Sequence, residues 1–179
     1  MCVFCGSSLG NGAAFARMAE DVARAIVRAG YGIVYGGGSV GLMGALADAA
    51  LSDGGEVVGV IPRALFGAEI AHAGLTRLEL VDGMHQRKAR MLELSDAFIA
   101  LPGAFGTMDE LCEVLSWRQL GIHAKPVGLL DFGGYYEHLI ALFDAMVRTQ
   151  FLTPENRRLV VSAERISPLL RRMGLTPFE

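Results

Sequence analysis

Short apolar runs alternate along the chain with stretches of helical periodicity, and this alternation constrains the fold more than any other feature of the sequence. Short apolar runs bounded by glycine or proline indicate buried strands. Alternating strands and helices predict β-α-β units, whose right-handed crossovers build a parallel sheet covered on both faces. We therefore predict an α/β, Rossmann-like, doubly wound fold with a mainly parallel sheet of about six or seven strands.

The boundaries of the predicted elements follow from the apolar runs and the turn residues between them. The predicted strands are Cys2–Cys5, Gly32–Tyr35, Val57–Ile61, Leu78–Val81, Ala97–Leu101 and Val127–Leu130, with a weaker one at Leu159–Ser162. The predicted helices are Ala13–Ala29, Leu42–Ser52, Met84–Leu94, Thr107–Leu120, Tyr135–Thr149 and Ser167–Met173. No linker or repeat divides the sequence, so we expect one domain over residues 1–179.

Composition excludes several classes of protein. Hydrophobic residues make up 52% of the chain, which excludes disorder and favours doubly buried strands together with a subunit interface. No apolar stretch reaches the roughly 18 residues of a membrane span, so no membrane partner is expected. The net charge of −3 argues against a nucleic-acid partner, including single-stranded DNA. Three cysteines make no disulfide framework and are expected to pack, and without a basic leader we expect a cytoplasmic location.

Three loops of small residues follow three of the predicted strands. They are Gly6–Gly10, Gly36–Gly41 and Gly103–Gly106. Ligands of open parallel sheets bind outside the carboxyl ends of the strands, where the strand order reverses. If the first strand is central, the first and fourth strands flank that reversal and the three loops converge on one crevice. Small residues let a ligand approach the backbone, so the sequence predicts a site for a nucleotide or another phosphate-bearing ligand.

The segment after the Ala97–Leu101 run carries the clearest candidate for chemistry. A helix is expected to open at Thr107, with Asp109 and Glu110 in its first turn. Such a helix start offers free N–H groups and a positive dipole end to a phosphate. Thr107 and Glu110 also fit a capping box, in which Glu110 would bond only its own backbone. Glu110 is therefore either a helix cap or a carboxylate that acts on a ligand.

The loop Gly36–Gly41 fits the dinucleotide pattern G-x-G-x-x-G, which is weak evidence by itself. The next strand ends at Arg63 and not at an acid, so only an NADP site would fit. The alternatives are a tight turn or a loop that contacts one phosphate or ribose. Under the last of these, the phosphate contacts are Gly36, Gly37, Gly38 and Ser39, together with Gly103, Gly106 and Thr107.

A basic cluster, Met84–Arg90, precedes the Ala97–Leu101 run. On a helix, Arg87 shares a face with Met84 and Met91. A solvated basic face explains Arg90 better than Arg87, because a cation in the first turn opposes the helix dipole. Arginine suits bidentate recognition of phosphate or carboxylate, which makes Arg87 a second candidate. The cysteines and histidines show no metal spacing and no nucleophile elbow occurs, so no metal is expected.

Two of these segments resemble motifs of the Lonely guy (LOG) family. Pro102–Glu110 resembles its P-G-G-x-G-T-x-x-E motif, and Met84–Ala89 matches its M-H-x-R-K-A element. The resemblance extends from Cys5-Gly6-Ser7-Ser8 to Val161-Ser162-Ala163 and so covers nearly the whole chain. Ala104 replaces the second glycine of the motif, where a methyl group would tighten the loop or oppose a positive φ.

The resemblance implies a cytokinin riboside 5′-monophosphate phosphoribohydrolase that also hydrolyses AMP and releases an adenine-type base and ribose 5-phosphate. It implies no metal, no organic cofactor, and a homodimer with its sites near the interface. It further implies that Arg87 and Glu110 are the catalytic pair. The implied substrate contacts are Glu69, Arg87, Lys88, Ala104, Phe105, Gly106, Thr107, Met108, Asp109, Glu110 and Ser116. From their position in the sequence, Met84 and Gly103 join these contacts.

Two alternatives stay open beside this interpretation. One is a general purine 5′-monophosphate nucleosidase, and the other is a non-catalytic nucleotide or cofactor carrier on the same fold. A carrier needs the loops but not both Arg87 and Glu110. Chains of this kind also bear an older label, lysine decarboxylase, which we reject because neither Lys88 nor Lys125, the only lysines, has the setting of a pyridoxal phosphate site.

Overall fold

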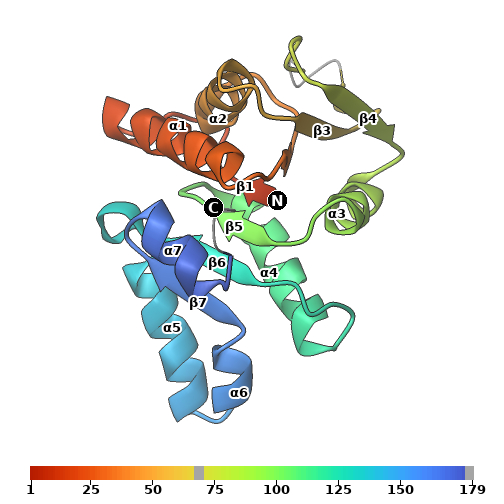
Figure 1. Ribbon diagram of the computed structural model, residues 1–179. Coiled ribbons are helices and arrows are strands. Elements are labelled where there is room, and N and C mark those ends of the chain that lie inside the picture. The colour runs from red at the N-terminus through yellow and green to blue at the C-terminus, as the bar shows by residue number, and fades with distance from the viewer. Residues whose placement is uncertain (67–70, 176–179) are drawn as a thin grey trace.

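The computed structural model describes residues 1–66 and 71–175. This part of the chain forms a seven-stranded sheet in the order β4-β3-β2-β1-β5-β6-β7, and every neighbouring pair of strands is parallel (Figure 1). The predicted α/β doubly wound fold is confirmed. The strands are β1 (Cys2–Phe4), β2 (Ile33–Tyr35), β3 (Val57–Pro62), β4 (Arg77–Val81), β5 (Phe98–Ala100), β6 (Val127–Leu130) and β7 (Val160–Ala163). The helices are α1 (Ala13–Arg28), α2 (Gly41–Ser52), α3 (Met84–Glu93), α4 (Phe105–Gln119), α5 (Glu137–Arg148), α6 (Pro154–Arg157) and α7 (Ile166–Arg172), with a 3-10 turn, η1, at Phe132–Gly134.

Two apolar cores lie on the two faces of the sheet. Helices α1, α2 and α7 cover one face, and α3, α4 and α5 cover the other (Figure 1). Within β1, Val3 packs on the first face while Cys2 and Phe4 pack on the second. Successive strand residues point to opposite faces, so a strand covered on both sides must be apolar at every position. This requirement explains the unbroken apolar runs of the sequence.

The position of β4 corrects one prediction. The strands that flank the reversal of order are β1 and β5, and not the first and the fourth, because β4 pairs with β3 at the edge of the sheet. The composition of β4 explains this placement. Arg77 is exposed and Glu79 is half-buried, and the two side chains form an ion pair. An edge strand accommodates such residues, whereas a central strand covered by helices on both faces would bury them.

The start of α4 corrects a second prediction. The helix begins at Phe105, with Ala104 as its N-cap, and no side chain caps it. Thr107 therefore lies inside the helix and the first turn contains no acid, so the predicted capping box does not form. Gly106 is compatible with the helical conformation, and the chain enters the helix two residues before Thr107. Glu110 consequently stands in the second turn of the helix.

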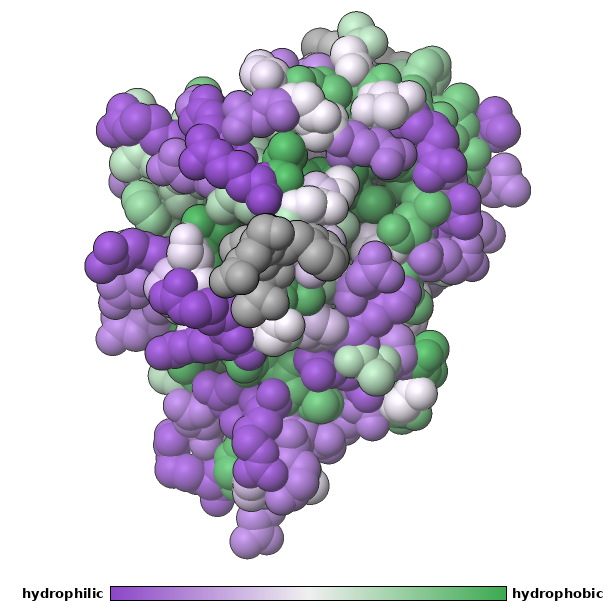
Figure 2. Space-filling model, in the orientation of Figure 1, coloured by the Kyte–Doolittle hydropathy of each residue, from purple (hydrophilic) through white to green (hydrophobic). Residues whose placement is uncertain are grey.

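The cysteines follow expectation in part. Cys2 and Cys5 are buried and pack on opposite faces of the sheet, but Cys112 is exposed on α4, so the expectation that all three pack is wrong for Cys112. On the face shown in Figure 2, hydrophilic residues cover most of the surface, and hydrophobic residues show between them and along part of the rim. Within the described ranges, no helix combines the length and the apolar character that crossing a bilayer requires.

Candidate functional site

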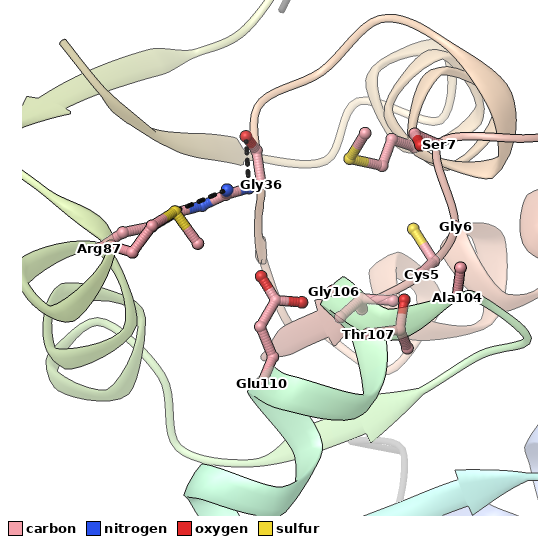
Figure 3. Close-up of a pocket in the computed structure, with 12 residues that line it drawn as sticks. Cys5, Gly6, Ser7, Gly36, Arg87, Ala104, Gly106, Thr107 and Glu110 are labelled. Atoms are coloured by element: carbon pink, nitrogen blue, oxygen red, sulfur yellow. Dashed lines mark hydrogen bonds between the residues drawn. The ribbon is translucent and has the colours of Figure 1, made fainter. Parts of the chain in front are cut away.

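A cavity of about 140 Å³ lies at the carboxyl ends of β1, β2 and β5, where the strand order reverses. Its wall includes Gly6 and Ser7 from the first loop, Gly36 from the second, and Ala104 from the third (Figure 3). The predicted convergence of the three loops is thus confirmed. Its position is the one at which open parallel sheets bind their ligands.

Close backbone contacts fix the three loops to one another. The N–H of Gly6 donates to the carbonyl of Pro102 at 3.1 Å, and the N–H of Leu42 donates to the carbonyl of Gly6 at 3.1 Å. Gly41 has a φ of +62°, and a Cβ there would lie 2.2 Å from the carbonyl carbon of Ser7. Only glycine tolerates both the conformation and the approach. The wall of the cavity is therefore held together by contacts within the protein.

The amino end of α4 opens into this cavity. Gly106 and Thr107 line it from the first turn, where backbone N–H groups have no acceptor within the helix. The side chain of Thr107 is buried and lies against Gly103, where an added Cβ would stand 2.1 Å from its Oγ1. N–H groups and the positive end of the helix dipole together favour an anion at this point.

Arg87 reaches the same cavity from α3. The residue is 7% exposed, and its Nη2 donates to the carbonyl of Gly36 at 3.1 Å (Figure 3). A Cβ on Gly36 would lie 2.2 Å from this Nη2, so the guanidinium occupies the space that a side chain would fill. Among the described residues, the buried Nε of Arg87 finds no hydrogen-bond partner. Arg87 thus forms part of the cavity wall while Gly36 holds one end of its guanidinium.

Glu110 enters from α4, so the two candidate catalytic side chains come from different helices (Figure 3). Its side chain is 9% exposed. Burial raises the pKa of the Cys5 thiol, which lines the same wall, and the negative charge of Glu110 raises it further. Cys5 therefore stays protonated and serves as a neutral part of the wall. The acid in this cavity is Glu110, and the cation is Arg87.

The predicted contact residues divide into two sets. The structure brings Gly36, Met84, Arg87, Ala104, Gly106, Thr107 and Glu110 to the cavity wall. Gly37, Gly38, Ser39, Lys88, Gly103, Phe105, Met108, Asp109 and Ser116 are not part of that wall. Glu69 lies outside the described residues. In the second loop, Gly37 and Gly38 are bonded within the protein. The carbonyl of Gly37 accepts a hydrogen bond from the N–H of His72 at 3.0 Å, and the carbonyl of Gly38 accepts one from the hydroxyl of Tyr35 at 3.0 Å. These two glycines shape the turn behind Gly36.

The wall also contains residues that were not among the predicted contacts. Gly6 and Ser7 belong to a loop expected at the crevice, so their small size and their place after a strand could have identified them as lining residues. Val3, Cys5 and Met43 read only as packing residues in the sequence, and no signal distinguished them from the core. Among residues 1–66 and 71–175, no group of three or more His, Cys, Asp or Glu side chains is placed to hold a metal ion.

Comparisons with known proteins agree with the motifs. A protein-family model described as "Possible lysine decarboxylase" matches residues 43–173. The "Probable cytokinin riboside 5'-monophosphate phosphoribohydrolase LOGL1" of Oryza sativa subsp. japonica is 51% identical over 173 residues, which cover 97% of this chain and 78% of the relative. The "Cytokinin riboside 5'-monophosphate phosphoribohydrolase LOG1" of Arabidopsis thaliana is 46% identical and covers 97% of this chain and 81% of its own.

Solved structures share the fold at low identity. A molybdenum cofactor binding protein from Rippkaea orientalis superimposes with a TM-score of 0.70 at 18% identity, covering 95% of this chain and 92% of that one. The molybdenum cofactor carrier protein of Chlamydomonas reinhardtii gives 0.68 at 21% identity, covering 93% and 89%. These likenesses concern the fold alone, whereas the family is shown by the sequence matches. With its two motifs meeting at one cavity and relatives of this identity along nearly its full length, the chain belongs to the Lonely guy (LOG) family.

Proposed function

We propose that this protein hydrolyses the N-glycosidic bond of cytokinin riboside 5′-monophosphates, and of AMP, to give the free base and ribose 5-phosphate. The observation that carries the proposal is the meeting of buried Arg87 and buried Glu110, from separate helices, in one cavity beside the amino end of α4. The names of relatives that are 46–51% identical over 97% of the chain support the same reaction.

The 5′-phosphate is assigned to the first turn of α4. Gly106 and Thr107 offer backbone N–H groups there, and Ser7 stands on the facing loop. Of the second loop, only Gly36 lines the cavity, so Gly37, Gly38 and Ser39 are assigned to support of the loop and not to direct phosphate contact. The ribose then lies over Glu110, and the base extends toward Met84 and Arg87.

Cleavage of the glycosidic C–N bond builds positive charge on the sugar and negative charge on the base. The Glu110 carboxylate stabilises the oxocarbenium-like sugar and orients the attacking water. The oxygen of that water bonds to the anomeric carbon as the bond to the base breaks, and the proton that the water loses is balanced by the proton that the departing base takes up. The buried Arg87 guanidinium offsets the negative charge that develops on the leaving base. Both groups are buried. Electrostatic interactions are stronger in the protein interior than in water, so burial increases the effect of both charges.

The reaction is tested by incubating the protein with AMP, adenosine and a prenylated AMP and separating the products by chromatography. We expect free base from the two monophosphates and none from adenosine, because the phosphate anchors the substrate. Equal rates with AMP and prenylated AMP would identify a general purine monophosphate nucleosidase. Tight binding of AMP without release of adenine would contradict the proposed hydrolysis and support a non-catalytic carrier instead.

We also infer that the protein acts as a homodimer of single-domain subunits. The outer face of α4 supports this inference, because Cys112 and Ser116 line an open groove with the apolar side chains of Leu115, Phe143 and Met146. Light scattering after size-exclusion chromatography measures the assembly directly.

A cytoplasmic location is proposed on the strength of the free thiols Cys2, Cys5 and Cys112, since a reducing compartment keeps thiols unpaired.

Replacement of Ala104 by glycine, the family residue, is expected to leave the dissociation constant for AMP unchanged within about twofold. Ala104 has a φ of −97°, so its methyl group opposes no left-handed conformation. Glycine gains freedom mainly in the unfolded chain, and we expect the free energy of unfolding to fall by about 0.4–1 kcal/mol. Calorimetry with AMP and denaturant titration measure the two quantities. A tenfold gain in affinity for the Ala104→Gly variant would show that the methyl group does obstruct the phosphate.

A further inference from the structure

The side chain of Lys88 joins the two helices that carry the candidate catalytic residues. Lys88 belongs to α3, and its Nζ lies 3.0 Å from a carboxylate oxygen of Asp109 and 2.5 Å from one of Glu113. These two acids stand one turn apart on α4, so one ammonium group contacts both. We call Lys88, Asp109 and Glu113 the Lys88 cluster.

The environment of the Lys88 cluster differs from that of an ordinary surface ion pair. The side chain of Lys88 is 10% exposed and that of Glu113 is 20% exposed. Burial lowers the pKa of Lys88, but the contacts with Glu113 and Asp109 outweigh it and the pKa is raised. Lys88 is therefore a charged group whose ammonium is already engaged by protein carboxylates. It also stands outside the cavity wall.

The Lys88 cluster lies next to both candidate catalytic residues in the sequence and can therefore influence where they are placed. Lys88 follows Arg87 directly on α3, and Asp109 precedes Glu110 directly on α4. Arg87 and Glu110 line the cavity (Figure 3), while their chain neighbours Lys88 and Asp109 form an ion pair between the two helices. A shift of α3 relative to α4 thus changes the separation of the guanidinium and the carboxylate. Misplacement by about 1 Å can lower a rate by about 100-fold.

We propose that Lys88 is a positioning residue, which holds α3 against α4 through Asp109 and Glu113 and so sets the placement of Arg87 relative to Glu110. This inference rests on the proposed function and differs from the resemblance, which implies a direct substrate contact for Lys88. A positioning residue controls the turnover of bound substrate, whereas a substrate contact controls binding. The two roles therefore predict different kinetic changes.

The test compares Lys88→Met with Lys88→Arg and with the control Arg90→Met. Arg90 lies on the same helix but pairs with Glu79 of β4 at 2.6 Å and with Glu93 at 2.8 Å, on the side away from α4. For Lys88→Met we expect kcat for base release from AMP to fall about 10- to 100-fold, with the Kd of AMP unchanged within about twofold. Lys88→Arg keeps the charge and restores most of kcat, and Arg90→Met keeps the kcat of the wild type.

Two results would overturn the proposal. A rise in the Kd of AMP at unchanged kcat would make Lys88 a substrate contact. A lower melting temperature with unchanged kcat would make the Lys88 cluster a purely structural link. Because Lys88→Met leaves Glu113 partly buried without its cation, the double variant Lys88→Met with Glu113→Leu removes that charge and must show the same loss of kcat.

Crystal structures of the wild type and of Lys88→Met give a readout that does not depend on turnover. We expect α3 to be displaced from α4 in the variant, with the contact between Arg87 Nη2 and the carbonyl of Gly36 lengthened or broken. Superimposable helices with Arg87 in place would contradict the inference. If the wild type releases no base, the proposed function fails, and the two structures still decide whether Lys88 positions Arg87.

Discussion

Replacing Glu110 by glutamine is expected to lower the rate of base release from AMP by about 100- to 10,000-fold, while AMP still binds with nearly the affinity of the wild type. Glutamine keeps the size of the side chain and removes the negative charge that the oxocarbenium-like sugar requires. The phosphate contacts are assigned to the first turn of α4, one helical turn away, and they are unaffected. Single-turnover kinetics with labelled AMP and calorimetry with unlabelled AMP measure the two effects separately.

The matched control for this variant is Glu137→Gln, which neutralises an exposed acid in the first turn of α5. It should leave both rate and affinity unchanged. Because α4 begins at Phe105 and no capping box forms, a loss of rate in Glu110→Gln is not explained by loss of a helix cap. Turnover at the rate of the wild type would show that Glu110 takes no part in the chemistry.

Replacing Gly36 by alanine is expected to lower the rate of base release by about 100-fold, although the new methyl group need not touch the substrate. The added Cβ would lie 2.2 Å from Nη2 of Arg87 and 3.3 Å from the sulfur of Met43. The guanidinium is the flexible end of its side chain, so it must leave the position beside the Gly36 carbonyl. We therefore expect Gly36→Ala to lower the rate of base release by a factor similar to that of Arg87→Met, which removes the guanidinium altogether.

The control for Gly36→Ala is Gly12→Ala. Gly12 is extended, with a φ of −178°, and a Cβ there meets nothing within 4 Å. A crystal structure of Gly36→Ala shows where the guanidinium goes, and steady-state kinetics measure how the displacement changes turnover. A displaced guanidinium with full turnover would exclude Arg87 from the reaction and contradict the proposed catalytic pair.

The sequence predicted the parts of the fold that depend on local pattern. Apolar runs such as Val57–Ile61 identified strands because a strand covered on both faces allows no polar side chain. The place of β4 was not predictable in this way, since the runs show where strands lie but not which strands pair. The polar residues Arg77 and Glu79 carried the relevant signal, because they suit an edge. The start of α4 was missed because the box formed by Thr107 and Glu110 is also a real helix-capping pattern.

In the site, too, residues with a local signal could be predicted and contacts between distant segments could not. Arg87 and Glu110 were chosen from local context, because a cation in a first helical turn and an acid beside an anion site both need an explanation. The partners of Lys88 could not be chosen, because Asp109 and Glu113 come close to it only once α3 and α4 pack. The role of Gly36 depends on a contact between residues 36 and 87, which no spacing along the chain encodes.

The central place of β1 ties the site to the order in which the chain folds. Cys2 pairs with Val34 on one side and with Phe98 on the other, so β1 is synthesised well before β5 and waits for it before its second edge is closed. Pairings between residues this distant along the chain slow folding. Until β5 joins, Gly6 and Ser7 have no α4 amino end opposite them. An incomplete nascent chain therefore lacks the α4 part of the proposed nucleotide site, and a nucleotide that needs this part would stabilise only the folded molecule.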